Sequence, residues 1–149
     1  MTKALHKNSI SHGDLHHENI LVDKNGELKL LDYDSICIPE LDGGPDVCRG
    51  RQNYQLPSRL SSPLIASVTN DYFSELIIYL SLKAIIEKPL LWKQYNSQQQ
   101  KMLFNQVDFI FFNDTPIYKD LILLSNDVVE LVRKLEEYLS CHRFLSPFN

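Results

Sequence analysis

The sequence predicts an α+β fold that is mainly α-helical, in which a small β-hairpin precedes a helical body. Three observations support this prediction. Asn25-Gly26 separates two short apolar runs, which indicates a hairpin. Residues 71–88 are apolar nearly all the way round a helix, which is typical of a buried central helix. Residues 125–141 are apolar along one stripe, which is typical of a helix lying on a core.

The first half of the chain is expected to carry little helix. Residues 1–11 form a lead-in such as the tail of a helix. Residues 12–38 hold a loop, the hairpin and a third short strand near 36–38. Residues 39–70 are rich in Gly, Pro, Ser and Asp and keep no period. They predict one long ordered loop, a feature that is usually functional or mobile in a compact domain.

The second half, residues 71–141, is expected to be a helical body, followed by a tail over 142–149. Thr69 or Asn70 is expected to cap the central helix, and Pro89 to stop it. Shorter helices are expected near 90–95, 98–105 and 118–124.

The composition restricts the classes of function. The chain has 149 residues, 44% of them hydrophobic, as expected for a single globular domain over 1–149. A net charge of −4 without a basic run does not favour nucleic-acid binding. No apolar stretch is long enough for a membrane span, and the first residues do not resemble a signal peptide. The 3 cysteines form no C-x-x-C motif, so reduced cysteines and a cytoplasmic location are expected.

The hairpin is expected to bring three oxygen-bearing side chains together. A turn centred on Asn25-Gly26 places Asn19 opposite Asp32. One hard divalent cation can bridge such an amide oxygen and carboxylate, and Asp14 is expected to fold back over the pair. Two metal ligands and a proton acceptor are the minimum set for metal-assisted phosphoryl transfer. The alternative is a polar hairpin end, in which Asp14 caps a turn and the other two share a hydrogen bond.

Five segments, in this order, resemble the C-terminal lobe of the protein-kinase-like superfamily. Residues 12–14 (His-Gly-Asp) resemble the catalytic-loop His-Arg-Asp, and Asn19 falls at the catalytic-loop asparagine. Residues 32–34 (Asp-Tyr-Asp) resemble the metal-binding Asp-Phe-Gly motif. Residues 53–59 stand where an Ala-Pro-Glu-type element closes the activation segment, and residues 71–74 are similar to the start of the central helix.

This resemblance implies a role for each matching residue. Asp14 would accept or orient the proton of the attacking hydroxyl, and Asn19 and Asp32 would hold Mg²⁺ on the phosphates of ATP. His16 occupies a catalytic-loop position where protein kinases usually carry lysine, and a neutral imidazole there stabilises less charge. Asp71 would hydrogen-bond the backbone of the catalytic loop.

The sequence also departs from the family pattern. Gly13 replaces the arginine that pairs with a phosphorylated activation segment, so regulation by that route is not expected. Asp34 replaces a glycine, either as a further metal ligand or as a turn cap. Eleven residues precede His12 and no G-x-G-x-x-G motif occurs, so the N-terminal lobe is expected to be absent.

The resulting functional prediction is a kinase-like lobe for transfer from ATP to a hydroxyl, with protein Ser/Thr as the favoured acceptor. It is expected to be weak or inactive as this chain alone. A catalytically silent binding or scaffold module is one alternative. A fragment of a small-molecule phosphotransferase of the aminoglycoside or choline kinase type is another, since those enzymes also carry a histidine at the position of His16. The expected partners are a protein substrate and, at the exposed active-site face, either a second copy of this chain or a separate partner chain.

Overall fold

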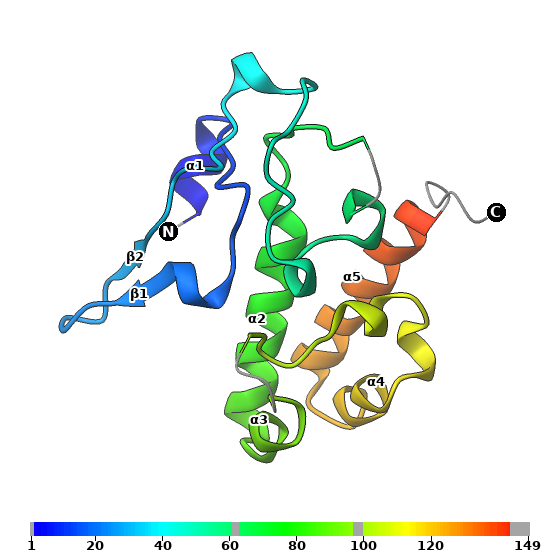
Figure 1. The fold of residues 1–149 in the computed structure, drawn as a ribbon. Coiled ribbons are helices and arrows are strands. Elements are labelled where there is room, and N and C mark those ends of the chain that lie inside the picture. Colours follow the sequence, from blue (N-terminus) through cyan, green and yellow to red (C-terminus); the bar gives the residue numbers. More distant parts are fainter. Residues whose placement is uncertain (1, 61–62, 97–99, 144–149) are drawn as a thin grey trace.

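The computed structural model describes residues 2–60, 63–96 and 100–143 and confirms the mainly helical α+β prediction. The helices and strands are α1 (Lys3–Lys7), β1 (Ile20–Val22), β2 (Leu28–Leu30), α2 (Asp71–Glu87), α3 (Leu90–Tyr95), α4 (Pro116–Leu121) and α5 (Asn126–Arg143). Short 3-10 helices span His17–Asn19, Pro39–Leu41, Gln52–Tyr54, Pro57–Leu60, Gln106–Phe109 and Phe112–Asp114. The hairpin and α1 lie on one side of α2, α4 and α5 lie on the other side, and α3 lies at the lower end of α2 (Figure 1).

The turn of the hairpin differs from the one expected. In this turn, all of which is described, only Gly26 has a positive φ, of 83°, whereas the expected turn also needs one at Asn25. The Asp23 and Glu27 backbones pair instead, with Asp23 N–H donating to the Glu27 carbonyl at 2.9 Å. The Asp23 carboxylate also accepts from the Asn25 and Glu27 N–H groups, at 2.8 and 3.0 Å. The loop therefore has three residues and ends in a left-handed glycine.

This turn shifts the strand register by one residue, so the predicted register was wrong. Ile20 lies opposite Leu30. One step further, the Leu31 N–H donates to the Asn19 carbonyl at 2.9 Å. Asn19 is therefore paired with Leu31, and Asp32 lies one residue beyond the pair that was expected.

The core forms between α2 and α5, as the two helical patterns indicate. The buried apolar residues of α2 are Phe73, Ile77, Ile78, Leu80 and Ala84. Those of α5 are Val128, Val132, Leu135 and Leu139. Full burial of a Val, Leu, Ile or Phe side chain contributes about 1.5–3 kcal/mol to stability. The helix α2 is less enclosed than expected, because Tyr79 and Ile86 are 54% and 77% exposed.

Several local predictions need correction. The Asn70 side chain does not cap α2, because its oxygen accepts a hydrogen bond from Arg59 instead. Of the helix expected over 98–105, residues 98 and 99 lie outside the described residues, and 100–105 are not helical. In place of a strand at 36–38, a single bridge pairs Ser11 with Cys37.

Candidate active site

A buried carboxylate at the start of α2 positions the loop that carries Asp14. Asp71 is 1% exposed, and its two oxygens accept the backbone N–H groups of His12, at 2.5 Å, and Gly13, at 3.0 Å. These contacts join residues that are 59 and 58 positions apart. The role that the family resemblance implied for Asp71 is confirmed by these two hydrogen bonds.

His12 connects the same loop to the end of β2. Its fully buried ring donates from Nε2 to the carbonyl of Leu31 at 2.7 Å. The other ring nitrogen is buried and has no hydrogen-bond partner among the described residues. Leu31 in turn donates to the Asn19 carbonyl. The His12 side chain therefore joins the segment before Asp14 to the segment before Asp32. The sequence motif had not assigned this role to His12.

Gly13 is required by the local geometry. Its φ is 83°, and a Cβ atom there would lie 2.0 Å from the carbonyl oxygen of Ser35. Any other residue would have to move the Ser35 backbone and adopt a left-handed conformation. This accounts for glycine at a position where the kinase motif carries arginine.

Three of the four predicted site residues lie together in one loop. Asp14 is 24% exposed in its side chain, and its Oδ2 lies 3.7 Å from Nε2 of His16. The Asn19 side-chain nitrogen donates to the backbone carbonyl of Asp14 at 3.1 Å. The planar amide of Asn19 therefore directs its oxygen away from that carbonyl, which leaves the oxygen for a ligand.

His16 is 5% exposed, and its surroundings disfavour the protonated imidazole. Burial, and then the positive charge of Arg51, lower the pKa of the His16 imidazole below its usual value, against a smaller opposing effect of Asp14. The ring can therefore take part in hydrogen bonds near Asp14, but at neutral pH it does not supply a positive charge.

Asp32 is exposed and directly follows Leu31, whose N–H donates to the Asn19 carbonyl. Its backbone φ of 60° is unusual for a residue other than glycine, and such strain is concentrated at functional sites. Within the described residues its carboxylate makes no hydrogen bond with the other three, and no group of three or more His, Cys, Asp or Glu side chains is arranged to hold a metal ion. The carboxylate of Asp34 also makes no hydrogen bond within the described residues, so no contact supports its proposed role as a turn cap.

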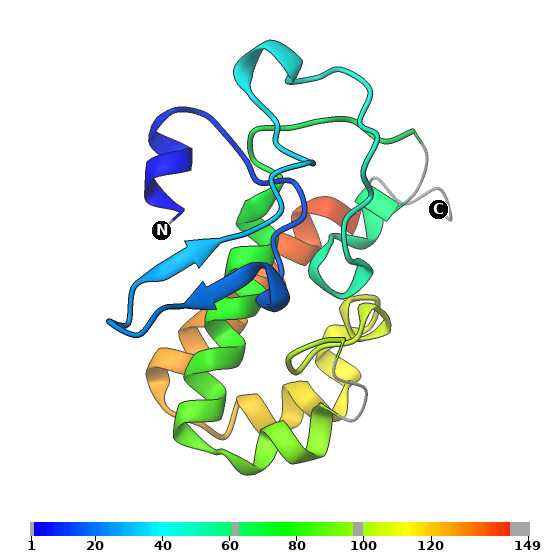
Figure 2. The same ribbon diagram turned by 60° about the vertical axis from the view of Figure 1, so that its left-hand side comes forward.

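Residues 50–54, part of the loop expected over 39–70, lie against this site, which the sequence did not reveal. The Arg51 N–H donates to Oδ1 of Asp14 at 2.8 Å, and the Arg51 guanidinium forms an ion pair with Glu18. Tyr54 shares a hydrogen bond of 2.5 Å with His17, and its ring stacks on that imidazole. Both contacts span 37 positions in the sequence. In both views the loop lies over the N-terminal end of α2 (Figures 1 and 2).

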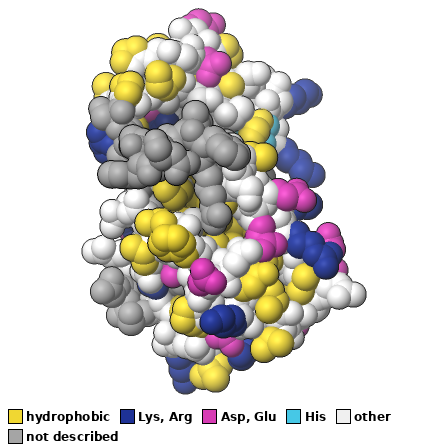
Figure 3. Space-filling model, turned by 90° about the vertical axis from the view of Figure 1, so that its right-hand side faces the viewer, with side chains coloured by type: hydrophobic (Ala, Val, Ile, Leu, Met, Phe, Trp, Pro, Cys, Tyr) yellow, Lys and Arg dark blue, Asp and Glu magenta, His cyan; other side chains and the backbone are white. Residues whose placement is uncertain are grey.

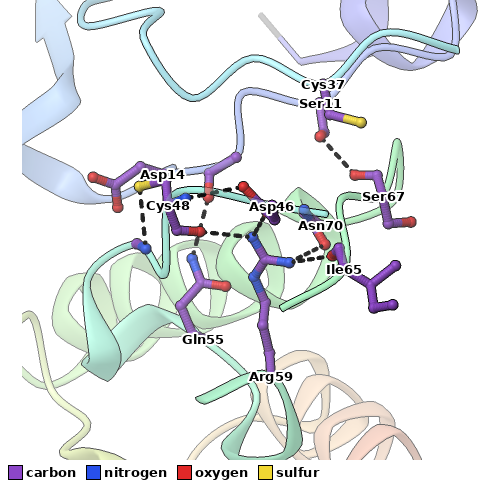
Figure 4. A network of polar contacts seen from close by, with 12 residues as sticks. Ser11, Asp14, Cys37, Asp46, Cys48, Gln55, Arg59, Ile65, Ser67 and Asn70 are labelled. Atoms are coloured by element: carbon purple, nitrogen blue, oxygen red, sulfur yellow. Dashed lines mark hydrogen bonds and ion pairs between the residues drawn. The ribbon is translucent and has the colours of Figure 1, made fainter. Parts of the chain in front are cut away.

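Arg59 fastens the same loop. Its side chain is 11% exposed and lies 2.5 Å from the Asp46 carboxylate. It also donates to the Ile65 carbonyl at 3.0 Å, to the Asn70 side-chain oxygen at 2.9 Å and to the Cys48 carbonyl at 3.2 Å. Figure 4 shows the guanidinium between these groups, with Gln55 pointing toward the segment of Asp14.

A cavity of about 280 Å³ lies beside Arg59. Its lining includes Gln55, Arg59, Phe73 and Tyr138, and excludes the four predicted site residues.

The described helices include none that is long and apolar enough to cross a membrane.

Comparison with known proteins gives two matches. The family model described as protein kinase domain matches residues 2–144. The Dual specificity protein kinase zak2 of Dictyostelium discoideum is 46% identical over 46 residues, which are 30% of this chain and 7% of that protein. The matched segment is thus a small part of a much longer relative. No solved structure matches the chain significantly.

Proposed function

The chain belongs to the protein kinase domain family, and we propose that it forms the catalytic-loop half of an ATP- and Mg²⁺-dependent phosphotransferase of the cytoplasm. In this proposal residues 1–149 are a single unit equivalent to the C-terminal lobe, and the acceptor is a hydroxyl, with protein Ser or Thr favoured. The observation that carries the proposal is the buried Asp71 carboxylate, which holds the backbone just before Asp14. Such an anchor is needed where the position of a catalytic carboxylate decides the rate.

Asp14 orients the acceptor hydroxyl and receives its proton. Its Oδ1 already accepts the Arg51 N–H, so the carboxylate cannot rotate freely and Oδ2 is left for the substrate. His16 adjoins Oδ2 as a neutral imidazole and limits how the hydroxyl approaches. Proton acceptance by a positioned carboxylate contributes about 100-fold to 10,000-fold in rate.

The amide oxygen of Asn19 and the carboxylate of Asp32 are the groups that would hold Mg²⁺. Both are oxygen ligands, which Mg²⁺ prefers, and this ion commonly takes only one or two protein ligands beside substrate phosphates. The free Asn19 oxygen and the strained, exposed Asp32 fit this use. Bound Mg²⁺ supplies neutralisation of charge on the phosphates.

Titration calorimetry with ATP, in the presence and absence of Mg²⁺, tests this proposal. We expect Mg²⁺ to strengthen ATP binding to the wild-type chain, and Asp32→Ala to remove that effect. Glu27→Gln is the matched control, because it removes another exposed carboxylate from the hairpin and should retain the Mg²⁺ effect. Equal binding by the wild type and Asp32→Ala would contradict the metal role.

Two alternatives are distinguished by transfer of labelled phosphate. A silent binding module is favoured by the buried imidazole of His16, which lies beside Oδ2 of Asp14 where a kinase-like site would need a cation. It would bind nucleotide without transferring phosphate to any acceptor. A small-molecule phosphotransferase is favoured by the histidine at position 16, and it would label an aminoglycoside or choline but not a protein. We expect label on protein Ser or Thr, at a rate that Asp14→Asn abolishes.

A partner at the hairpin face is also part of the proposal. Val22 and Leu28, which lie opposite each other in the hairpin, are 66% and 50% exposed, which is high for large apolar side chains. The face shown in Figure 3 instead has its visible hydrophobic groups scattered among charged ones. Apolar side chains gathered on one element tend to acquire a partner. We expect either self-association or binding of a separate N-terminal lobe, and a monomer at high concentration in sedimentation would contradict self-association.

A further inference from the structure

Arg51 contacts both ends of the segment from Asp14 to Glu18. Its backbone N–H holds Oδ1 of Asp14 at 2.8 Å, and its guanidinium pairs with Glu18. The preceding Gly50 has a φ of 67°, and a Cβ there would lie 2.4 Å from the Gln55 side-chain nitrogen and 3.1 Å from Oδ1 of Asp14. The close approach of residues 50 and 51 to Asp14 therefore requires glycine at position 50, where a side chain would collide with Gln55 and Asp14. The backbone of Arg51 is fixed at the site independently of its side chain.

Among the described residues, the partner of the guanidinium is the exposed Glu18. The side chains of Arg51 and Glu18 are 30% and 48% exposed. Ion pairs at such positions contribute little, because water and salt screen them and both long side chains lose freedom. A ligand anion near Asp14 can therefore compete with Glu18 for the guanidinium.

The charges at the site show why a phosphoryl group beside Asp14 would need the guanidinium. Asp14 is acidic, and His16 beside it is buried and neutral at neutral pH. A phosphoryl group at this place would add further negative charge. Arg51 has its backbone fixed against Asp14, so its side chain is placed to provide the missing cation. The planar guanidinium also matches two oxygens of a phosphoryl group better than an ammonium does.

We propose that Arg51 exchanges Glu18 for a phosphoryl group lying beside Asp14 and donates its guanidinium N–H groups to the phosphoryl oxygens. Arg51 is then the residue of the long loop that stabilises the transferred group, and Glu18 holds the guanidinium when no phosphoryl group is present. This inference rests on the proposed phosphotransferase function, since it assigns the ligand of the same site.

Binding of inorganic phosphate to the whole chain, followed by the ¹⁵N NMR signals of arginine Nε, tests the exchange without requiring enzymatic activity. We expect saturable binding that shifts the Arg51 signal and is lost in Arg51→Met. Arg51→Lys should retain weaker binding. Arg49→Met is the matched control, because it removes one positive charge two residues away and should still bind phosphate. Glu18→Gln should bind phosphate as tightly as the wild type, or up to about fivefold more tightly.

Three results would overturn the inference: no saturable phosphate binding by the wild type, unchanged affinity in Arg51→Met, or weaker binding in Glu18→Gln. Thermal unfolding of each variant verifies that it is folded. We expect the Arg51 variants to fold, because the contact between Arg51 and Asp14 is made by the Arg51 backbone and not by its side chain. The Mg²⁺ dependence of ATP binding is measured separately through Asp32→Ala. Phosphate bound through Arg51 without any Mg²⁺ effect on ATP would reject the proposed function and leave the anion site. A Mg²⁺ effect on ATP binding, together with phosphate binding that does not depend on Arg51, would support the proposed function and overturn the inference about Arg51.

Discussion

Replacement of Asp71 by asparagine should release the catalytic-loop backbone. The wild-type carboxylate accepts two N–H groups in a site that is 1% exposed. Asparagine keeps one acceptor oxygen and turns an N–H₂ group toward the second donor. A hydrogen bond to a charged group is worth about 1.5–3 kcal/mol, and a buried donor without a partner costs about 1–3 kcal/mol. Removal of a buried charge offsets part of this loss.

The expected destabilisation of Asp71→Asn is about 3 kcal/mol. Urea unfolding measures it globally, and hydrogen exchange measures it at the loop. If the loop opens locally, the amides of His12 and Gly13 should exchange about 100-fold faster, since 1.4 kcal/mol corresponds to a factor of ten.

Asp127→Asn is the matched control for Asp71→Asn. Asp127 also lies in the first turn of a helix, but its side chain is 77% exposed and pairs with Lys83. Its removal should cost at most about 1 kcal/mol and leave the loop amides protected. If Asp71→Asn destabilises the protein no more than Asp127→Asn, the assigned anchoring role is refuted.

Two further predictions concern stability. Gly13→Ala should destabilise the protein by more than about 2 kcal/mol, whereas Gly26→Ala, with the same φ of 83° but open space around it, should cost only about 1 kcal/mol in urea unfolding; equal losses would contradict the steric argument. Hydrogen bonds from Tyr95 and then Lys88 lower the pKa of Asp120, so its stabilising effect is present above the usual value of 3.8 and lost as pH falls through the lower folded-state pKa. The stability difference between wild type and Asp120→Asn should therefore shrink below about pH 4, and a difference independent of pH would reject this account.

Much of the fold was accessible from local patterns. The apolar stripe of α5 and the long apolar run of α2 predicted both helices to within one or two residues. The hairpin was predicted from Asn25-Gly26, but the register was not, because the same dipeptide fits a two-residue and a three-residue loop. The hydrogen bonds that the Asp23 carboxylate accepts from the Asn25 and Glu27 N–H groups favour the longer loop. The expected helix over 98–105 failed over its described part, where buried side chains such as Leu103 and Phe104 pack from irregular backbone.

The site divides in the same way. Asp14, His16 and Asn19 lie within six residues of one another, so a short motif was sufficient to name them and to predict one loop. Asp71, which holds that loop, could be named only through resemblance, and its two hydrogen bonds were visible only in the folded chain. No local signal connected Arg51 with Asp14, since their contact spans 37 positions.

Sequence alone was sufficient for the mainly helical α+β class, the presence of a hairpin and the kinase-like motif, because each depends on residues that are neighbours in the chain. Packing was needed for the strand register, for the clamp made by Arg59 and for the covering of Asp14 by the long loop. These features depend on hydrogen bonds and charges between segments far apart in the chain. Because buried polar groups need hydrogen-bond partners, these pairings depend on which groups the folded chain brings together.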